Sequence, residues 1–133
     1  MYSMKQTCQL TGLTYETLKY YCNEGLIPGV TRDAHNHRVF DDDAIAWLRG
    51  IGCLRRCGLS IAEMRHYVDL CLAGDATIPE RQRILASRRA ALVAQLAEVQ
   101  ESIAYIDAKQ RYYEGVLAGE NPTPPDPQPT GPR

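Results

Sequence analysis

The chain has 133 residues, of which 44% are hydrophobic and 23% are charged, and its formal net charge at pH 7 is −1. This length suits one compact domain and leaves no room for a second large one, and the composition is ordinary for a soluble globular protein. No run approaches the roughly 18 consecutive apolar residues of a membrane span, and the first residues lack the pattern of a secretory signal, so we expect a cytoplasmic protein with no membrane partner. The near-zero charge excludes a general attraction to phosphate, so nucleic-acid binding would need local clusters of positive charge.

The first part of the chain predicts two short helices separated by a tight turn. Ser3–Met4–Lys5–Gln6 has the form of a capping box, and a helix is expected from about Met4 to Thr11, where Gly12 ends it. Thr14 can cap a second helix over Tyr15–Asn23. Two short helices joined by a turn that contains glycine have the spacing of a helix-turn-helix, although many enzymes contain such hairpins too.

A short hairpin, or wing, is expected after the second helix. Pro28 prevents that helix from continuing, and the polar stretch Thr31–His37 separates Val30 from Val39–Phe40. Asp41 is then a suitable N-cap for a third helix, which Gly58 closes. We expect its apolar face to form most of a small core together with three earlier leucines, the whole set being Ile45, Leu48, Ile51, Leu54, Leu13, Leu18 and Leu26.

Two further helices are predicted in the second half of the chain. Ser60–Glu63 is a second capping box, and it starts a helix that ends near Gly74. Thr77–Glu80 reads as a third capping box, with Pro79 at the first helical position, where its missing N–H costs nothing. From there to Ala118 the chain has no further proline, so the last helix would span about 40 residues, or roughly 60 Å.

The long helix carries apolar residues at heptad spacing. One row recurs every seven residues and a second row interleaves with it, interrupted at Arg89 and Gln110. The rows are Leu85, Leu92, Val99, Ile106 and Tyr113, and Leu96, Ile103 and Leu117. This spacing predicts a coiled-coil seam with a second copy of the chain, because the alternative, packing on its own domain, offers too little surface to cover the helix. The heptads leave the parallel or antiparallel orientation open.

Residues 119–133 hold six of the eight prolines, with polar residues between them. A segment of this composition cannot bury a core, so a disordered tail is predicted.

Several motifs of the first 75 residues occur in a specific order and spacing. They are Thr17–Leu18–Lys19–Tyr20–Tyr21, Gly25–Leu26–Ile27–Pro28, the wing residues Arg32, Asn36, Arg38 and Phe40, and Gly58–Leu59–Ser60–Ile61. Together they closely resemble the amino-terminal signature of the MerR family of transcription regulators. The sequence departs from that signature at Lys19, where arginine is more usual and a bidentate fork is lost, and at Cys22, which replaces an expected acidic residue.

The resemblance implies a mainly α fold in three parts. These are a winged helix-turn-helix over residues 1–75, a dimerisation helix over 77–118 that forms an antiparallel coiled coil with the partner subunit, and the proline-rich tail over 119–133. It further implies a homodimer that binds a pseudo-palindromic promoter in double-stranded DNA. With RNA polymerase at that promoter, the dimer would alter transcription by distorting an overlong spacer.

The expected DNA contacts lie on the second helix and the wing. Residues at the start of a recognition helix meet base edges, while Lys19, Arg32 and Arg38 concentrate positive charge that can bind phosphate. For the adjacent tyrosines Tyr20 and Tyr21, core packing and DNA contact both remain open. The full set is Thr14, Tyr15, Thr17, Lys19, Tyr20, Tyr21, Arg32, His35, Asn36 and Arg38.

Five cysteines raise the question of a sensor, namely Cys8, Cys22, Cys53, Cys57 and Cys71. Their odd number argues against a complete disulfide framework, and reduced, buried thiols are the default interpretation. Thiolates also suit zinc or copper, but metal-sensing members of the family carry cysteines in a loop after the long helix, and residues 119–133 contain none. We therefore expect no metal and no other cofactor.

A reactive thiol is the third interpretation, and it concerns Cys53. Its neighbourhood, Ile51 to Arg56, followed by Gly58–Ile61 and the long helix, resembles the aldehyde- and electrophile-responsive branch of the family. Arg55 and Arg56 would favour the reactive thiolate if they point toward the sulfur.

Three other functional classes compete with this interpretation. An enzyme is disfavoured because His35, His37 and His66 lie in a polar loop or alone on a helix, and no nucleophile motif, phosphate-binding glycine loop or pair of catalytic carboxylates is present. A coiled-coil adaptor would explain the long helix but not the cationic residues of the second helix and wing. A regulator that responds to a small apolar ligand without thiol chemistry also remains open.

Overall fold

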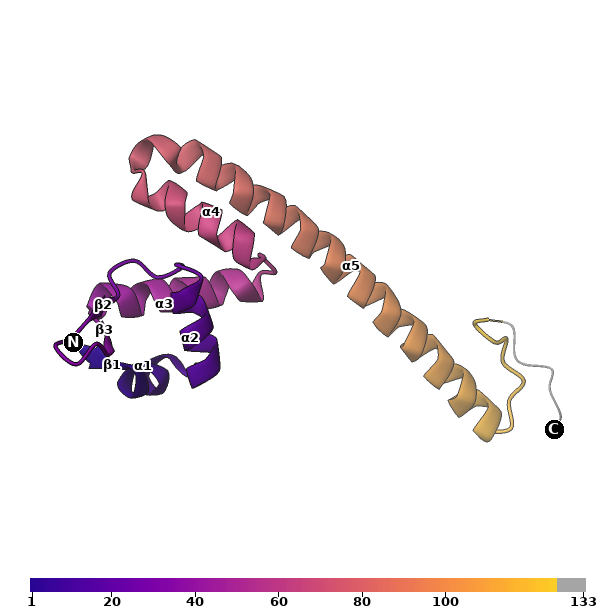
Figure 1. Ribbon diagram of the computed structural model, residues 1–133. Helices are drawn as coiled ribbons and strands as arrows, with labels where there is room; N and C mark the ends of the chain where they lie inside the picture. Colours follow the sequence, from indigo (N-terminus) through magenta and orange to yellow (C-terminus); the bar gives the residue numbers. More distant parts are fainter. Residues whose placement is uncertain (127–133) are drawn as a thin grey trace. The chain divides into compact units, whose positions relative to one another are not determined.

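The structure is a computed structural model that describes residues 1–126, and it is mainly helical (Figure 1). In chain order the elements are β1 (Tyr2–Ser3), α1 (Met4–Thr11), α2 (Tyr15–Asn23), β2 (Thr31–Arg32), β3 (Arg38–Phe40), α3 (Asp42–Arg56), α4 (Ile61–Leu72), a 3-10 turn (Asp75–Thr77) and α5 (Ile78–Leu117). The contacts divide the chain into two units, Met1–Arg88 and Arg89–Arg133. The division falls inside α5, beyond the boundary near residue 77 that the sequence suggests.

Local capping explains where the first helices begin and end. The Ser3 hydroxyl accepts the Gln6 amide at 3.1 Å, and the Gln6 side chain accepts the Ser3 amide at 2.9 Å, so the predicted capping box is confirmed. Gly12 ends α1 at a φ of 74°, a left-handed conformation that costs glycine little. Thr14 caps α2 by accepting the Thr17 amide at 3.2 Å. Both helices therefore have the bounds that the sequence predicts.

A small antiparallel sheet carries the wing. Its strand order is β1-β3-β2, and the predicted hairpin is the β2–β3 pair, in which Arg32 lies opposite Arg38. The first strand, β1, is an addition that the sequence did not predict, and it sets Tyr2 opposite Phe40. A two-residue strand has too little pattern to be recognised in the sequence, because it exists only through its pairing with a distant strand.

The core of the first unit lies between α2, α3 and α4. Leu18, Leu26, Leu48 and Ile51 are buried as predicted, while Leu13 and Leu54 are only partly buried at its edge. Tyr21, Phe40, Met64 and Val68 complete the cluster, so α4 and the wing contribute more to it than the sequence indicated.

The junction between α4 and α5 differs from the prediction. Ser60 and Glu63 form the expected capping box of α4. Thr77, however, does not cap α5, because it lies in the 3-10 turn rather than in the extended conformation that an N-cap needs. Its hydroxyl donates to the carbonyl oxygens of Leu70 and Gly74 at 2.5 and 2.8 Å, so the predicted third capping box is wrong.

The first turns of α5 belong to the first unit. His66 Nε2 on α4 lies 3.2 Å from a carboxylate oxygen of Glu80. Ile84 packs against the core cluster, and the guanidinium of Arg88 lies against Gly58, whose φ is 93°. The first part of α5, up to Arg88, therefore belongs to the globular first unit, which we call the head. Only the part of α5 after Arg88 is a candidate for dimerisation along its whole surface.

In the second unit, the chain after α5 turns back along the helix. Gly119 has a φ of 79°, and the Glu120 amide donates to the carbonyl oxygen of Gly115 at 3.0 Å. The Asp126 carboxylate accepts the Tyr105 hydroxyl and lies 3.1 Å from Lys109 Nζ. The described part of the predicted disordered tail is thus in contact with α5, and the rest of that prediction, 127–133, lies outside the described residues. Over residues 1–126, no helix is long and apolar enough to cross a membrane.

Candidate nucleic-acid interface

The start of α2 exposes the side chains that the sequence assigns to DNA. The Thr14 and Thr17 hydroxyls are hydrogen-bonded to each other at 2.9 Å, which orders the first turn. Tyr15 and Lys19, one turn apart, are both exposed. Tyr15 and Lys19 therefore share an exposed side of α2, while Leu18 and Tyr21 face the core.

The two adjacent tyrosines have different environments. Tyr21 is 1% exposed and packs in the core cluster, whereas Tyr20 is 46% exposed. Neighbouring residues on a helix point in directions about 100° apart, so one of the two had to face away from the core. Tyr20 is therefore the tyrosine that is accessible to a ligand, and Tyr21 is a core residue.

The tip of the wing is organised by Asp33. Its carboxylate accepts the backbone amides of His37 and His35 at 3.0 and 2.9 Å, and these bonds, that of His37 foremost, lower the pKa of Asp33. Asn36 has a φ of 64°, a left-handed conformation that asparagine tolerates better than most residues. Arg32 Nη1 donates to the Asn36 carbonyl oxygen at 2.9 Å and closes the loop.

Arg38 links the wing to the end of α2. Its Nη2 donates to Asn23 Oδ1 at 2.6 Å, which holds β3 beside the helix. Cys22, next to this contact, is a half-buried thiol whose pKa is raised by that burial, with Arg38 and Arg32 opposing the rise. A raised pKa keeps Cys22 protonated and unreactive at neutral pH.

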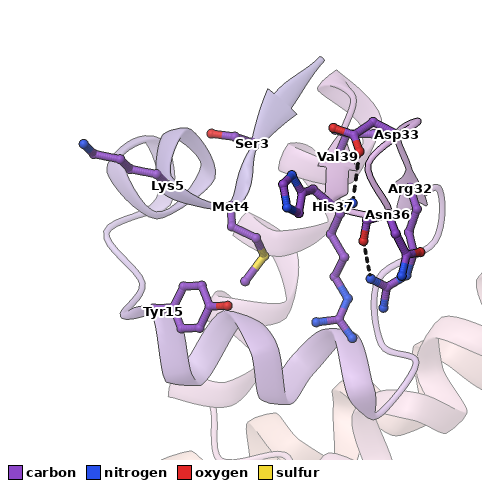
Figure 2. A pocket seen from close by; sticks show the side chains of 10 residues that line it. Ser3, Met4, Lys5, Tyr15, Arg32, Asp33, Asn36, His37 and Val39 are labelled. Carbon is purple, nitrogen blue, oxygen red and sulfur yellow. Dashed lines mark hydrogen bonds between the residues drawn. The ribbon is translucent and has the colours of Figure 1, made fainter.

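These elements enclose an open cavity of about 380 Å³ between the start of α1, the start of α2 and the wing. Figure 2 shows the His37 imidazole beside Met4 and the Tyr15 hydroxyl turned toward the wing, while Lys5 extends away from the other side chains. Three cationic side chains, Lys5, Arg32 and Arg38, line the cavity against one acidic side chain, Asp33.

The cavity brings together residues that lie far apart along the chain. Tyr15, Arg32, Asn36 and Arg38 were all predicted DNA contacts, and all four line it. His37 was interpreted only as wing structure, and α1 was given no part in binding. No local signal marks either of them, because their place beside α2 depends on the pairing of β1 with β3.

The proposed sensor thiol lies elsewhere, on α3. Cys53 is exposed, and Arg56 Nη2 lies 3.1 Å from its sulfur, whereas Cys8, Cys22, Cys57 and Cys71 are less exposed. Arg56 therefore points toward the sulfur, as the interpretation of a reactive thiol requires. Across residues 1–126, no group of three or more histidine, cysteine or acidic side chains is arranged to hold a metal ion.

A helix-turn-helix with a β-hairpin wing, and with three cationic side chains lining the cavity between them, defines a winged-helix DNA-binding protein. Comparison with known families narrows this class. Residues 2–71 match the MerR HTH family regulatory protein model, and residues 45–109 match the model described as MerR, DNA binding. The chain belongs to the MerR family, whose members are DNA-binding transcription regulators and not enzymes.

Individual relatives agree with this assignment. The chain is 40% identical over 91 residues to the HTH-type transcriptional regulator AdhR of Bacillus subtilis, a match covering 68% of this chain and 65% of AdhR. It is 28% identical over 117 residues to an HTH-type transcriptional regulator of Haemophilus influenzae, covering 88% and 87%.

Solved structures support the same conclusion. HiNmlR, a MerR family regulator lacking the sensor domain and bound to promoter DNA, superposes with a TM-score of 0.75 at 28% identity, over 90% of this chain and 91% of HiNmlR. A MerR family protein from Listeria monocytogenes gives a TM-score of 0.79 at 28% identity, over 90% of each chain.

Proposed function

We propose that the protein acts as a homodimer that binds a pseudo-palindromic promoter and alters transcription by RNA polymerase through distortion of the spacer DNA. The observation that carries the dimer is the apolar row on α5. Leu96, Val99, Ile103 and Ile106 are between 52% and 57% exposed in the single chain. A contiguous apolar row at heptad spacing is the surface that a second helix covers in a coiled coil.

The turn-back of the chain after α5 is compatible with this dimer. Asp126 contacts Tyr105 and Lys109, and although Lys109 lies only about 60° around the helix from Ile106, Ile103 and Ile106 remain 52% and 57% exposed with this segment in place. The seam therefore stays accessible, and a second copy of α5 fits there. Two linked heads on one duplex would match the two half-sites of a pseudo-palindrome.

The signal that we propose is an electrophile that reacts with Cys53. The Cys53 sulfur is exposed, so an electrophile can reach it, and Arg56 Nη2 lies 3.1 Å from it. Alkylation or oxidation would add bulk or remove the thiolate charge at α3, which packs against α4 and the wing strand β3. A change there can bias the head toward another arrangement on DNA.

An apolar effector site is the alternative to thiol chemistry. α3 and α4 enclose a hollow of about 180 Å³ lined by Trp47, Gly50, Ile51, Leu54 and Tyr67. This volume is below the roughly 300 Å³ at which small-molecule pockets begin, so we keep Cys53 as the proposed sensor.

Footprinting tests the function. The purified protein is titrated against the DNA upstream of its own gene at two salt concentrations, and we expect a symmetric protected region whose affinity weakens with salt. A coiled-coil adaptor would give neither saturable binding nor protection. That outcome would remove the proposal.

The sensor is tested on the same DNA. Formaldehyde, a thiol oxidant and a nitrosating agent should each change the footprint or the transcript made by added RNA polymerase. Cys53→Ser should abolish this response, whereas Cys57→Ser, a matched change one turn along the same helix, should retain it. A Cys53→Ser protein that still responds to all three reagents rules out Cys53 as the sensor.

A further inference from the structure

We propose that the cavity between α1, α2 and the wing binds one phosphodiester of the DNA backbone, and that His37 is a proton-dependent ligand of that phosphate. This inference rests on the proposed DNA-binding function and adds to it a binding residue, a ligand class and a pH dependence. The cavity, at about 380 Å³, is far larger than the roughly 30 Å³ share of one water molecule. It can therefore hold a phosphate group together with part of its hydration.

The charge of the cavity favours an anion. Arg38 is half-buried and fixed by its bond to Asn23, which uses only part of its five N–H donors. Arg32 is likewise held by the Asn36 carbonyl oxygen. Guanidinium groups that are already positioned bind phosphate with little loss of side-chain entropy.

Asp33 is the one acidic side chain that lines the cavity, and its carboxylate is engaged in hydrogen bonds within the wing. Its carboxylate accepts hydrogen bonds from two backbone amides of the wing, and these bonds lower the pKa of Asp33. The electrostatic interaction with the His37 side chain lowers the pKa of Asp33 further. Asp33 therefore orders the loop.

His37 has the position and the chemistry for a conditional ligand. Its ring faces Met4 in the cavity and is exposed, and in the described part of the chain its ring nitrogens make no hydrogen bond (Figure 2). Histidine is the side chain whose ordinary pKa places its change of charge between pH 5 and 8. A protonated imidazole can donate a hydrogen bond to phosphate that carries charge on both partners.

The groups around His37 determine whether DNA affinity rises or falls with pH. Its charged or titratable neighbours are His35 and Asp33 on the wing, Arg32 and Arg38 on the strands, Tyr15 on α2 and Lys5 on α1. A bound phosphate places a negative charge beside the imidazole and favours its protonated form, so binding takes up a proton and affinity falls as pH rises.

The experiment measures affinity as a function of pH. Dissociation constants are determined for the footprinted duplex at fixed salt between about pH 6 and about pH 8. We expect wild-type affinity to fall by up to about tenfold per pH unit for each protomer that takes up a proton. His37→Gln should bind with little pH dependence, and His37→Arg, which keeps the charge at every pH, should bind tightly at both ends of the range.

Controls assign the effect to one side chain and one phosphate. His66→Gln removes a histidine on α4, outside the cavity, and should leave the pH dependence intact. Neutral methylphosphonates placed in pairs, at the corresponding position of each half-site, should include one pair that abolishes the pH dependence of the wild type and has no further effect on His37→Gln.

The outcomes separate the two proposals. If the wild type does not bind DNA, the proposed function fails and this inference fails with it. If the wild type binds but His37→Gln keeps the full pH dependence, or if no pair of corresponding phosphates removes it, only the phosphate site is refuted. Circular dichroism of each variant confirms that a lost pH dependence does not reflect unfolding.

Discussion

Replacing Ile103 by aspartate should separate the two copies of the chain. Ile103 is 52% exposed in the single chain and lies in the middle of the apolar row on α5. Covering the exposed half of one isoleucine contributes about 1 kcal/mol to the free energy of dimerisation. A symmetric dimer contains two copies of Ile103, so the substitution removes about 2 kcal/mol of that free energy. Placing two carboxylates in the seam costs at least about 2 kcal/mol more.

The expected total of about 4 kcal/mol corresponds to a roughly thousandfold weaker dimer. Sedimentation velocity or light scattering over a dilution series measures this change directly. DNA binding should fall with it, since a separated head recognises only one half-site.

Ala94→Asp is the matched control. Ala94 precedes Ile103 by two and a half turns at about 3.6 residues per turn, so it lies on the opposite side of the helix. Alanine to aspartate costs the isolated helix more than isoleucine to aspartate, so the control is the more demanding substitution for helix stability. If Ile103→Asp dimerises as tightly as Ala94→Asp and the wild type, the seam is not the interface, and the dimer forms through another surface.

Three further predictions concern the head. Met64→Ala, at a fully buried position, should lower the free energy of unfolding by about 2–5 kcal/mol in a urea titration, and a loss below about 1 kcal/mol would contradict its place in the core. Arg38→Ala should weaken binding to most duplex sequences alike and reduce the salt slope by about 1 per protomer, since it removes a phosphate contact; unchanged affinity would show that the wing does not touch DNA. Limited alkylation followed by mass spectrometry should label Cys53 before Cys22 near pH 7.5, because burial raises the pKa of Cys22 and leaves less of its thiolate; labelling of Cys22 should catch up as pH increases, and equal rates at neutral pH would refute the ordering.

The sequence by itself determined the local features of this protein. The helix ends at Ser3, Gly12, Thr14 and Ser60 follow from side chains that bond to backbone groups within three or four residues. Such signals need no distant partner, so they are readable in the sequence. The heptad rows also follow from spacing alone, and the motifs of the first 75 residues carried the resemblance to the MerR family that the family models confirm.

Tertiary structure decided whatever depends on distant contacts. Only the packing of α2 assigns Tyr21 to the core and Tyr20 to the surface, because adjacent tyrosines carry the same local signal. The hydroxyl of Thr77 bonds backward to Leu70 and Gly74 instead of capping α5, because the preceding 3-10 turn places these carbonyl oxygens within reach.

The binding cavity is the clearest case of a tertiary feature. His37 reaches α1 and α2 only because β1 pairs with β3, and that two-residue strand has no pattern of its own. In the same way, the sequence placed Arg56 near Cys53, but only the folded side-chain conformation brings its guanidinium to the sulfur. Short-range hydrogen bonds and periodicity are encoded locally, whereas the surfaces that bind ligands form from side chains that the chain brings together when it folds.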